Sequence, residues 1–224
     1  MLNRLSALCA LTVAGTMLSG CLGGTPSVLD AAALAELVVD TRSNTAPMLL
    51  ETTTVPQNET ATYRGYMGGV IKDPGSNTRG THYVGNAAFD VRFTNQDIAF
   101  SGEVTDIIAR SGSELNDRYT TLQTGTKAEI EDMFDGYDTT TGTIRFADGK
   151  FVTGGVNPTQ VTSKVSGGFT HEGTDYAFGG ATNGYLFGAD GEGLNVNAET
   201  SDRLTLTANG AAREGDFATV VVKE

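Results

Sequence analysis

From Tyr63 onward, apolar residues recur at every second position, and this period of two constrains the fold more than any other feature of the chain. In the run 87–93 every second side chain is apolar and shares one face, while charged residues take the other face. The run 98–104 repeats the pattern after a short polar turn at 94–97. Two alternating runs divided by a short polar turn predict an antiparallel β-hairpin.

Similar runs continue toward the C-terminus and are separated by acidic residues followed by glycine. Asp148-Gly149 and Glu172-Gly173 each suit a tight hairpin turn, because such dipeptides tolerate positive φ. The chain contains 29 glycines in 224 residues, and those inside the alternating runs suit the strong coiling of a small barrel. The sequence therefore predicts an all-β fold, a single antiparallel β-barrel of about eight strands.

The apolar members of the alternating runs form the predicted barrel interior. They are Phe89, Val91, Phe93, Ile98, Phe100, Ile144, Phe146, Phe169, Phe178, Leu204, Leu206, Phe217 and Val221. An interior of this kind is filled by side chains or leaves room for one small ligand. A membrane-spanning barrel is the rival, and it would alternate apolar-out with polar-in between aromatic girdles. The charged strand face favours the barrel with an apolar interior.

Residues 112–138 do not follow the period of two. Thr126 is followed by a run in which Ile130 and Phe134 share one helical face, so a capped helical turn over 127–134 is expected. We interpret 111–138 as a long excursion that carries either this helix or a distorted strand.

The first residues resemble a bacterial lipoprotein signal peptide. A short cationic start containing Arg4 precedes an apolar run that is too short to span a bilayer, and the run closes on Leu-Ser-Gly before Cys21. The alternative is an ordinary signal peptide with a cysteine near its cleavage site. The lipoprotein resemblance implies removal of residues 1–20 and lipidation of Cys21. Leu22 after the lipidated position implies export to the outer membrane, by resemblance to lipoprotein sorting rules.

The mature chain is predicted to divide into a tether, 21–60, and a barrel domain, 61–224. Within the tether, 28–39 has apolar residues at helical spacing but ends in two valines, so a short helix and a strand are both open. The stretch 41–62 contains two prolines and many threonines, which suits an exposed linker or a strand edge.

Charge and cysteine content narrow the function classes. The formal net charge is −12, which argues against nucleic acid and anionic head groups as direct partners, because both require clustered Lys and Arg. A basic partner or simple solubility is favoured, with acidic segments at 129–132 and 190–192 as candidates for contact. After removal of Cys9 with the signal peptide, only Cys21 remains, which leaves no internal disulfide and no thiol for catalysis.

Two motifs of the body resemble those of transferrin-binding protein B-like surface lipoproteins. The hairpin 86–102 is similar to that family's "G-x-A-x-[FL]-x-V-x-F … [IL]-x-G" pattern, and 179–189 is similar to its late "G-x-F-[FY]-G-x-x-A" element. The resemblance covers 63–224 and implies a lipid-anchored barrel that captures a protein or a metal- or haem-type ligand, with an outer-membrane transporter as a further partner. The family's two-lobed layout and its transferrin-contacting loops have no counterpart here.

Catalytic and metal-binding patterns are weak. His82 and His171 lie beside turn sequences, with Asp73 and Glu172 as the nearest acids, and are expected to be exposed loop histidines. The acidic turn at 190–193 lacks calcium-loop spacing and is interpreted as a solvated tip. The seven tyrosines are expected to complete the core with their hydroxyls in water.

We therefore expect a binding protein and not an enzyme, with no catalytic residue, no metal site and no cofactor. A structural envelope lipoprotein is the first alternative. A hydrolase acting through His82 or His171 is the second.

Overall fold

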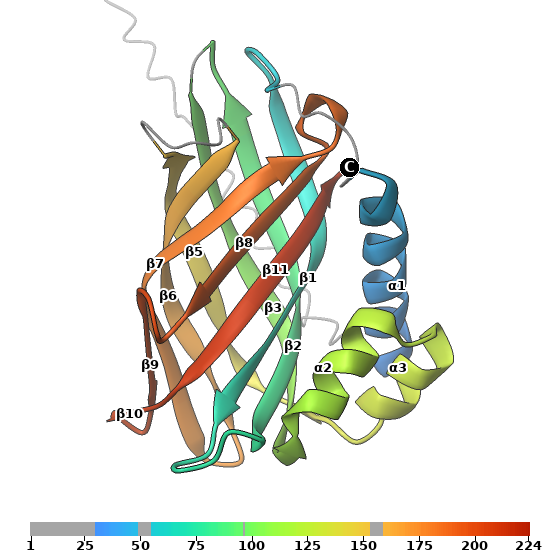
Figure 1. The fold of residues 1–224 in the computed structure, drawn as a ribbon, viewed down its shortest axis with the longest axis vertical. Coiled ribbons are helices and arrows are strands. Elements are labelled where there is room, and N and C mark those ends of the chain that lie inside the picture. The colour runs from blue at the N-terminus through green and yellow to red at the C-terminus, as the bar shows by residue number, and fades with distance from the viewer. Residues whose placement is uncertain (1–29, 49–54, 96, 153–158) are drawn as a thin grey trace, which may run out of the picture.

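The computed structural model describes residues 30–48, 55–95, 97–152 and 159–224, and it shows a closed β-barrel with three helices packed on one side (Figure 1). The helices are α1 (Ala31–Met48), α2 (Leu115–Thr124) and α3 (Lys127–Phe134), with a short 3-10 turn η1 (Ala189–Gly191). The strands are β1 (Thr60–Lys72), β2 (Arg79–Phe93), β3 (Ile98–Glu114), β4 (Asp138–Thr139), β5 (Thr141–Phe151), β6 (Gln160–His171), β7 (Thr174–Phe187), β8 (Gly193–Glu199), β9 (Leu204–Ala208), β10 (Ala211–Ala212) and β11 (Gly215–Lys223).

Eight antiparallel strands close the barrel, which confirms the predicted fold class. Their order around the wall is β1, β2, β3, β5, β6, β7, β8 and β11, and β11 pairs back with β1. The ring closes at β7, whose upper half pairs with β8 from Asn183 to Phe187. The lower half of the same edge pairs with β9 from Tyr176 to Gly180. Closure therefore leaves β7 paired on both sides, and this removes the open edge of the sheet there.

The lumen is filled by a column of aromatic side chains. Successive ring centroids lie 5.1–6.4 Å apart along the series Phe100, Phe89, Phe146, Phe217, Phe178, Phe169 and Tyr176. All thirteen residues predicted for the interior are buried in this cluster. Eight strands enclose little more space than side chains occupy, so aromatic rings of this size take the centre of the barrel.

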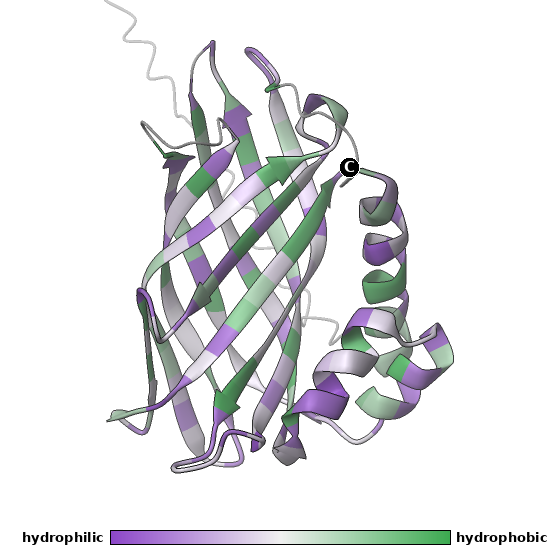
Figure 2. Cartoon of the chain, viewed as in Figure 1, coloured by the Kyte–Doolittle hydropathy of each residue, from purple (hydrophilic) through white to green (hydrophobic). Residues whose placement is uncertain are grey.

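The outer face of the wall carries the charged members of the strands. Arg92, Glu103 and Arg145 are exposed, whereas Val91, Val104 and Ile144, which adjoin them in the sequence, are buried in the lumen. Polar and apolar residues are interspersed along the strands (Figure 2). This apolar-in arrangement is the reverse of that in a transmembrane barrel. Within the described residues, the helices are too short or too polar to cross a membrane.

One of the predicted turns is wrong. The turns at 94–97 and Glu172-Gly173 are confirmed as hairpin connections. Asp148-Gly149 lies instead inside β5, where the register against β6 shifts between Ala147 and Lys150. Asp148 has φ of 55°, so the left-handed conformation expected for a turn is used for a β-bulge. The bulge lets the strand continue to Phe151.

The excursion after β3 contains two helices. The predicted helix with Ile130 and Phe134 turned inward is confirmed as α3, and Thr126 and Glu129 form a reciprocal capping box. The preceding helix α2 was not predicted. It ends at Thr124 and is followed by Gly125. The Arg42 guanidinium of α1 donates hydrogen bonds to the carbonyls of Leu122, at 2.9 Å, and Gly125, at 2.6 Å.

Residues 41–48, predicted to be part of an exposed linker or a strand edge, belong to helix α1 (Ala31–Met48). The prediction was wrong for these residues. Thr41 and Thr45 are buried and continue the buried face of the helix that Leu34 and Val38 begin. Threonine methyl groups extend an apolar face at helical spacing, although threonine reads as polar in a sequence.

A second apolar cluster joins the helices to the outside of the barrel. It contains Leu34, Ala35, Val38, Tyr66, Val84, Ile108, Leu122, Ile130, Met133 and Phe134. Leu122 of α2 packs over Gly68 of β1, where a β-carbon would lie only 2.5 Å from its Cδ2 atom. The glycine thus lets the helix approach the wall closely.

We predict that Leu122→Ala lowers the free energy of unfolding by about 2 to 3 kcal/mol, because it empties the contact with Gly68. Urea unfolding of the full chain measures this change. Gln123→Ala, on the exposed face of the same helix, is the control and should be nearly neutral. Equal stability of the two variants would contradict the packing role of α2.

Candidate functional site

The predicted lipidation residue, Cys21, lies outside the described residues. The remaining sequence-predicted residues are all described, and the two histidines and the acidic turn lie in three separate places. His82 lies beneath the helices on the outside of the wall. His171 lies at the barrel end that carries the β1–β2 turn and the β6–β7 hairpin, called here the basal end. The acidic turn at 190–192 lies at the opposite end (Figure 1).

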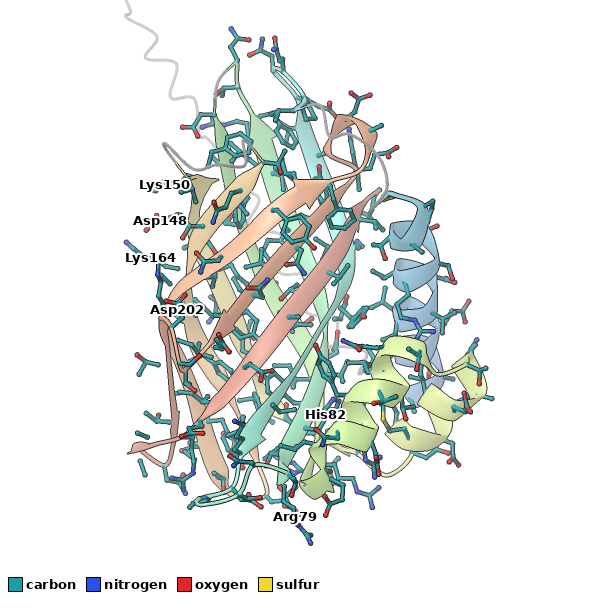
Figure 3. The ribbon with its side chains drawn as sticks, in the orientation of Figure 1. Arg79, His82, Asp148, Lys150, Lys164 and Asp202 are labelled. Carbon is teal, nitrogen blue, oxygen red and sulfur yellow. The ribbon has the colours of Figure 1, made fainter. Side chains whose placement is uncertain are left out.

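His82 is a buried strand residue, so the expectation of an exposed loop histidine was wrong. It belongs to β2, where α2 crosses the barrel wall (Figure 3). Its Nδ1 atom lies 2.8 Å from the hydroxyl of Tyr137, and the two rings meet edge to face. Burial, with a smaller effect from Arg118, lowers the pKa of His82 from 6.5 to about 3. The imidazole is therefore neutral at physiological pH.

Tyr137 and Arg118 complete this buried contact. The Arg118 guanidinium lies 5.6 Å from the centre of the Tyr137 ring, and it donates a hydrogen bond of 3.4 Å to the Met133 carbonyl. Burial raises the pKa of Tyr137 to about 12, so its hydroxyl keeps its proton. A neutral imidazole and a protonated phenol form a hydrogen bond without separating charge. This contact fastens the α3–β4 connection to the wall.

His171 is also buried, and the same prediction was wrong for it. The Glu172-Gly173 turn is so tight that His171 pairs with Thr174 as the last residue of β6. Only 1% of its side chain is exposed, and its Nε2 atom lies 3.6 Å from a carboxylate oxygen of Glu172.

Several tyrosines predicted to have wet hydroxyls bond inside the protein instead, as Tyr137 does with His82 and Tyr176 with the Thr81 hydroxyl. Tyr63 donates to the Gly191 carbonyl, and Tyr83 donates to the Asp216 carbonyl at 3.3 Å. Burial raises the pKa of both phenols. Among the described tyrosines, Tyr119 and Tyr185 are the large exposed ones.

The two predicted acidic segments do not form one surface. Residues 129–132 belong to α3, where the capping Glu129 and inward-facing Ile130 have structural roles. The turn at 190–192 is not wholly solvated, because Gly191 is buried and accepts the Tyr63 hydrogen bond.

A polar cleft of about 740 Å³ opens at the basal end and is named here the basal cleft. The β1–β2 turn and the connections on either side of β9 and β10 surround it. Its lining residues are Lys72, Asp73, Pro74, Gly75, Ser76, Asn77, Glu199, Thr200, Ser201, Ala212, Arg213, Glu214, Gly215 and Asp216. Four carboxylates against two cationic side chains make the basal cleft acidic. No sequence motif indicates it, because its residues come from distant turns.

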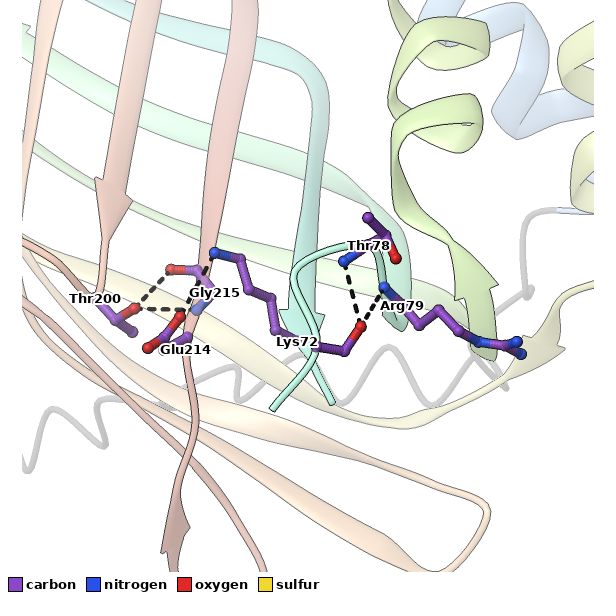
Figure 4. A network of polar contacts seen from close by, with 7 residues as sticks. Lys72, Thr78, Arg79, Thr200, Glu214 and Gly215 are labelled. Atoms are coloured by element: carbon purple, nitrogen blue, oxygen red, sulfur yellow. Dashed lines mark hydrogen bonds and ion pairs between the residues drawn. The ribbon is translucent and has the colours of Figure 1, made fainter. Parts of the chain in front are cut away.

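Hydrogen bonds hold the walls of the basal cleft in place (Figure 4). Lys72 pairs with Glu214 at 3.6 Å. The Thr200 hydroxyl accepts from the Gly215 amide at 3.0 Å and also contacts the Gly215 carbonyl at 3.2 Å. Ser76 accepts from the amide of Arg79 at 2.9 Å and so shapes the β1–β2 turn.

Asp216 is the partly buried carboxylate of the basal cleft. Burial raises its pKa, Lys72 opposes this shift, and the nearby charge of Glu199 adds to it. A cationic group that entered the cleft would relieve the repulsion between these carboxylates. The arrangement therefore suits recognition of positive charge.

We predict that His82 makes the protein sensitive to acid. Because its folded pKa is lowered, the unfolded chain binds a proton first, and stability falls as the pH drops from 6.5 toward about 3. Across this range the free energy of unfolding falls by up to about 1.4 kcal/mol per pH unit more in the wild type than in His82→Gln. Urea unfolding across this range, compared with values near neutral pH, measures it. Parallel curves for the two proteins would contradict the prediction.

Comparison with known proteins does not assign the chain to a family. No family model matches the chain, and no curated protein matches it. The resemblance to transferrin-binding protein B-like lipoproteins thus stays a prediction that rests on two short, glycine-containing motifs.

Proposed function

We propose that the protein is a lipid-anchored binding protein of the outer membrane, which captures a basic segment of a partner protein in its basal cleft. The observation that carries this proposal is the acidic basal cleft at the end of a barrel whose lumen is already filled. The proposed anchor is Cys21, from the lipoprotein-like signal.

The aromatic column supports binding outside the lumen. A small ligand such as haem would have to displace rings that contact one another along the barrel. Each such displacement would lose well-packed apolar contacts. A ligand at the barrel end meets no such cost, so we favour a protein partner over a metal- or haem-type ligand in the lumen.

The charge of the basal cleft supports a basic partner. Asp73, Glu199 and Glu214 expose carboxylates beside the partly buried Asp216. Opposite charge across an interface speeds association and favours the correct partner, and salt weakens it. The overall charge of −12 acts in the same direction.

The packing of α1 supports a short tether. Leu34 and Val38 are buried against the barrel side, and Glu36 pairs with Lys127 of α3 at 2.8 Å. Between Cys21 and Ala31 the chain can reach roughly 35 Å. An anchor at Cys21 would therefore keep the helix-covered side within that distance of the membrane.

The placement of both histidines supports binding over catalysis. His82 is fully buried beneath the helices, and the His171 ring is almost fully buried. A general base must reach the proton it abstracts. A substrate outside the barrel does not reach His82 in this arrangement.

We predict that Cys21→Ser abolishes fatty-acid incorporation and releases the protein from the membrane fraction, since several acyl chains give stable anchoring. Metabolic labelling with a fatty-acid probe, followed by fractionation, measures both effects. Ser19→Ala is the control and should keep the label. Label that survives the loss of Cys21 would refute the anchor.

We predict that a photo-crosslinker at Ser201, in the basal cleft, captures a basic envelope protein in intact cells. The same probe at Ser101, exposed on the wall of the barrel, should not. Asp73→Asn with Glu199→Gln should reduce the adduct several-fold, whereas Asp90→Asn with Glu103→Gln should not. Mass spectrometry identifies the captured protein. An acidic partner, or equal adducts from both probe positions, would overturn the proposal and favour a structural lipoprotein.

A further inference from the structure

Three potential metal ligands converge at the basal end from separate parts of the chain. Asp138 lies in β4, His171 ends β6, and Glu172 begins the β6–β7 turn. One ligand atom from each residue lies within 4.8 Å of the other two. Two atoms bound to one ion lie at most roughly 4.2 Å apart, twice a bond of about 2.1 Å. Both carboxylates are exposed, so a small side-chain rotation brings them within this range.

The buried His171 ring lacks hydrogen-bond partners, which independently supports a metal site. Its side chain is 1% exposed, and within the described residues neither ring nitrogen has a hydrogen-bond partner. A buried polar group without a hydrogen-bond partner destabilises the folded state. The ring lies with Nε2 only 3.6 Å from a Glu172 carboxylate oxygen, so its free nitrogen faces the carboxylate cluster. A bound ion would satisfy that nitrogen.

The backbone holds the site firmly. His171 is paired with Thr174 across the hairpin, and Glu172 and Gly173 occupy the left-handed region with φ of 48° and 74°. Asp138 is paired with Ala109 of β3. Ligands on strand ends and tight turns keep their positions, which is what a metal site requires.

The other buried histidine, His82, has surroundings that do not suit a metal ion. His82 also has a free Nε2 atom, but its Nδ1 atom contacts the Tyr137 hydroxyl. The charged group that affects it is the Arg118 guanidinium, which would repel a cation. His171 faces carboxylates instead.

We propose that Asp138, His171 and Glu172 bind a divalent transition-metal ion. The His171 nitrogen and one oxygen from each carboxylate provide three ligands, and the remaining positions take water or an atom of a partner. A nitrogen and two oxygens suit Zn²⁺ and its neighbours in the first transition row, whereas Ca²⁺ and Mg²⁺ prefer oxygen alone. This site departs from the sequence expectation of no metal, and it does not depend on the proposed anchor or partner.

The test uses the full chain, purified in a nonionic detergent and freed of metal. Titration with Zn²⁺ in competition with a chromophoric chelator should show one ion bound per chain. Asp138→Asn with Glu172→Gln should weaken binding at least tenfold, and His171→Gln should do the same. Asp190→Asn with Glu192→Gln removes the same charge at the opposite end and should leave binding unchanged. Titration with Co²⁺ should give visible absorption bands that His171→Gln alters, which reports the nitrogen ligand.

The outcomes separate clearly. No saturable binding of Zn²⁺ to the wild-type chain overturns the proposal. Equal affinity of the wild type and the Asp138→Asn, Glu172→Gln variant overturns it as well, because the ion would then lie elsewhere. If circular dichroism shows that His171→Gln is unfolded, the carboxylate variants decide the matter, since both side chains are exposed and their loss leaves the core intact.

Discussion

The rest of the structure depends on the way in which β7 closes the barrel. One edge of β7 pairs with β6 along its length, and the other edge is shared between β8 and β9. Without this shared edge, β7 would expose a row of unpaired backbone groups and the aromatic column would open to water. This shared edge also shortens the pairing between β8 and β11 at the basal end. Because the chain moves from β8 to β9 at 200–203, the β8–β11 ladder ends at Asp216, and the basal cleft opens beside that point.

The helices turn one side of the wall into a second apolar interface. Tyr66, Val84 and Ile108 point outward from their strands and would be exposed on a bare barrel, but α1, α2 and α3 bury them. Polar contacts fix this cover in place, with Arg42 bonded to the end of α2 and Tyr137 bonded to His82. The barrel thus has an apolar cluster on each side of the same strands.

A filled, closed barrel of this kind is a rigid support, and both proposed binding sites lie at its basal end. The basal cleft and the Asp138, His171 and Glu172 cluster both occupy places where strands end and turns begin. Turns on a rigid scaffold commonly carry binding residues, since they are exposed and yet well positioned. Both places are rich in carboxylates, so the basal end is suited to positive charge in two forms, a basic protein segment and a metal ion.

Local patterns in the sequence determined the class of fold and the composition of the core. Alternation predicted all thirteen interior residues correctly, and the Thr126 capping box predicted α3, because both depend on neighbours a few positions away. Tertiary structure alone decided the rest. Asp148-Gly149 became a bulge and not a turn, because the adjacent strand β6 continues alongside it. His82 is buried because the helical segment, distant in sequence, packs over it. His171 is buried at the end of a strand because the hairpin after it is tight. Burial and convergence are properties of what packs nearby, and no short stretch of sequence contains that information.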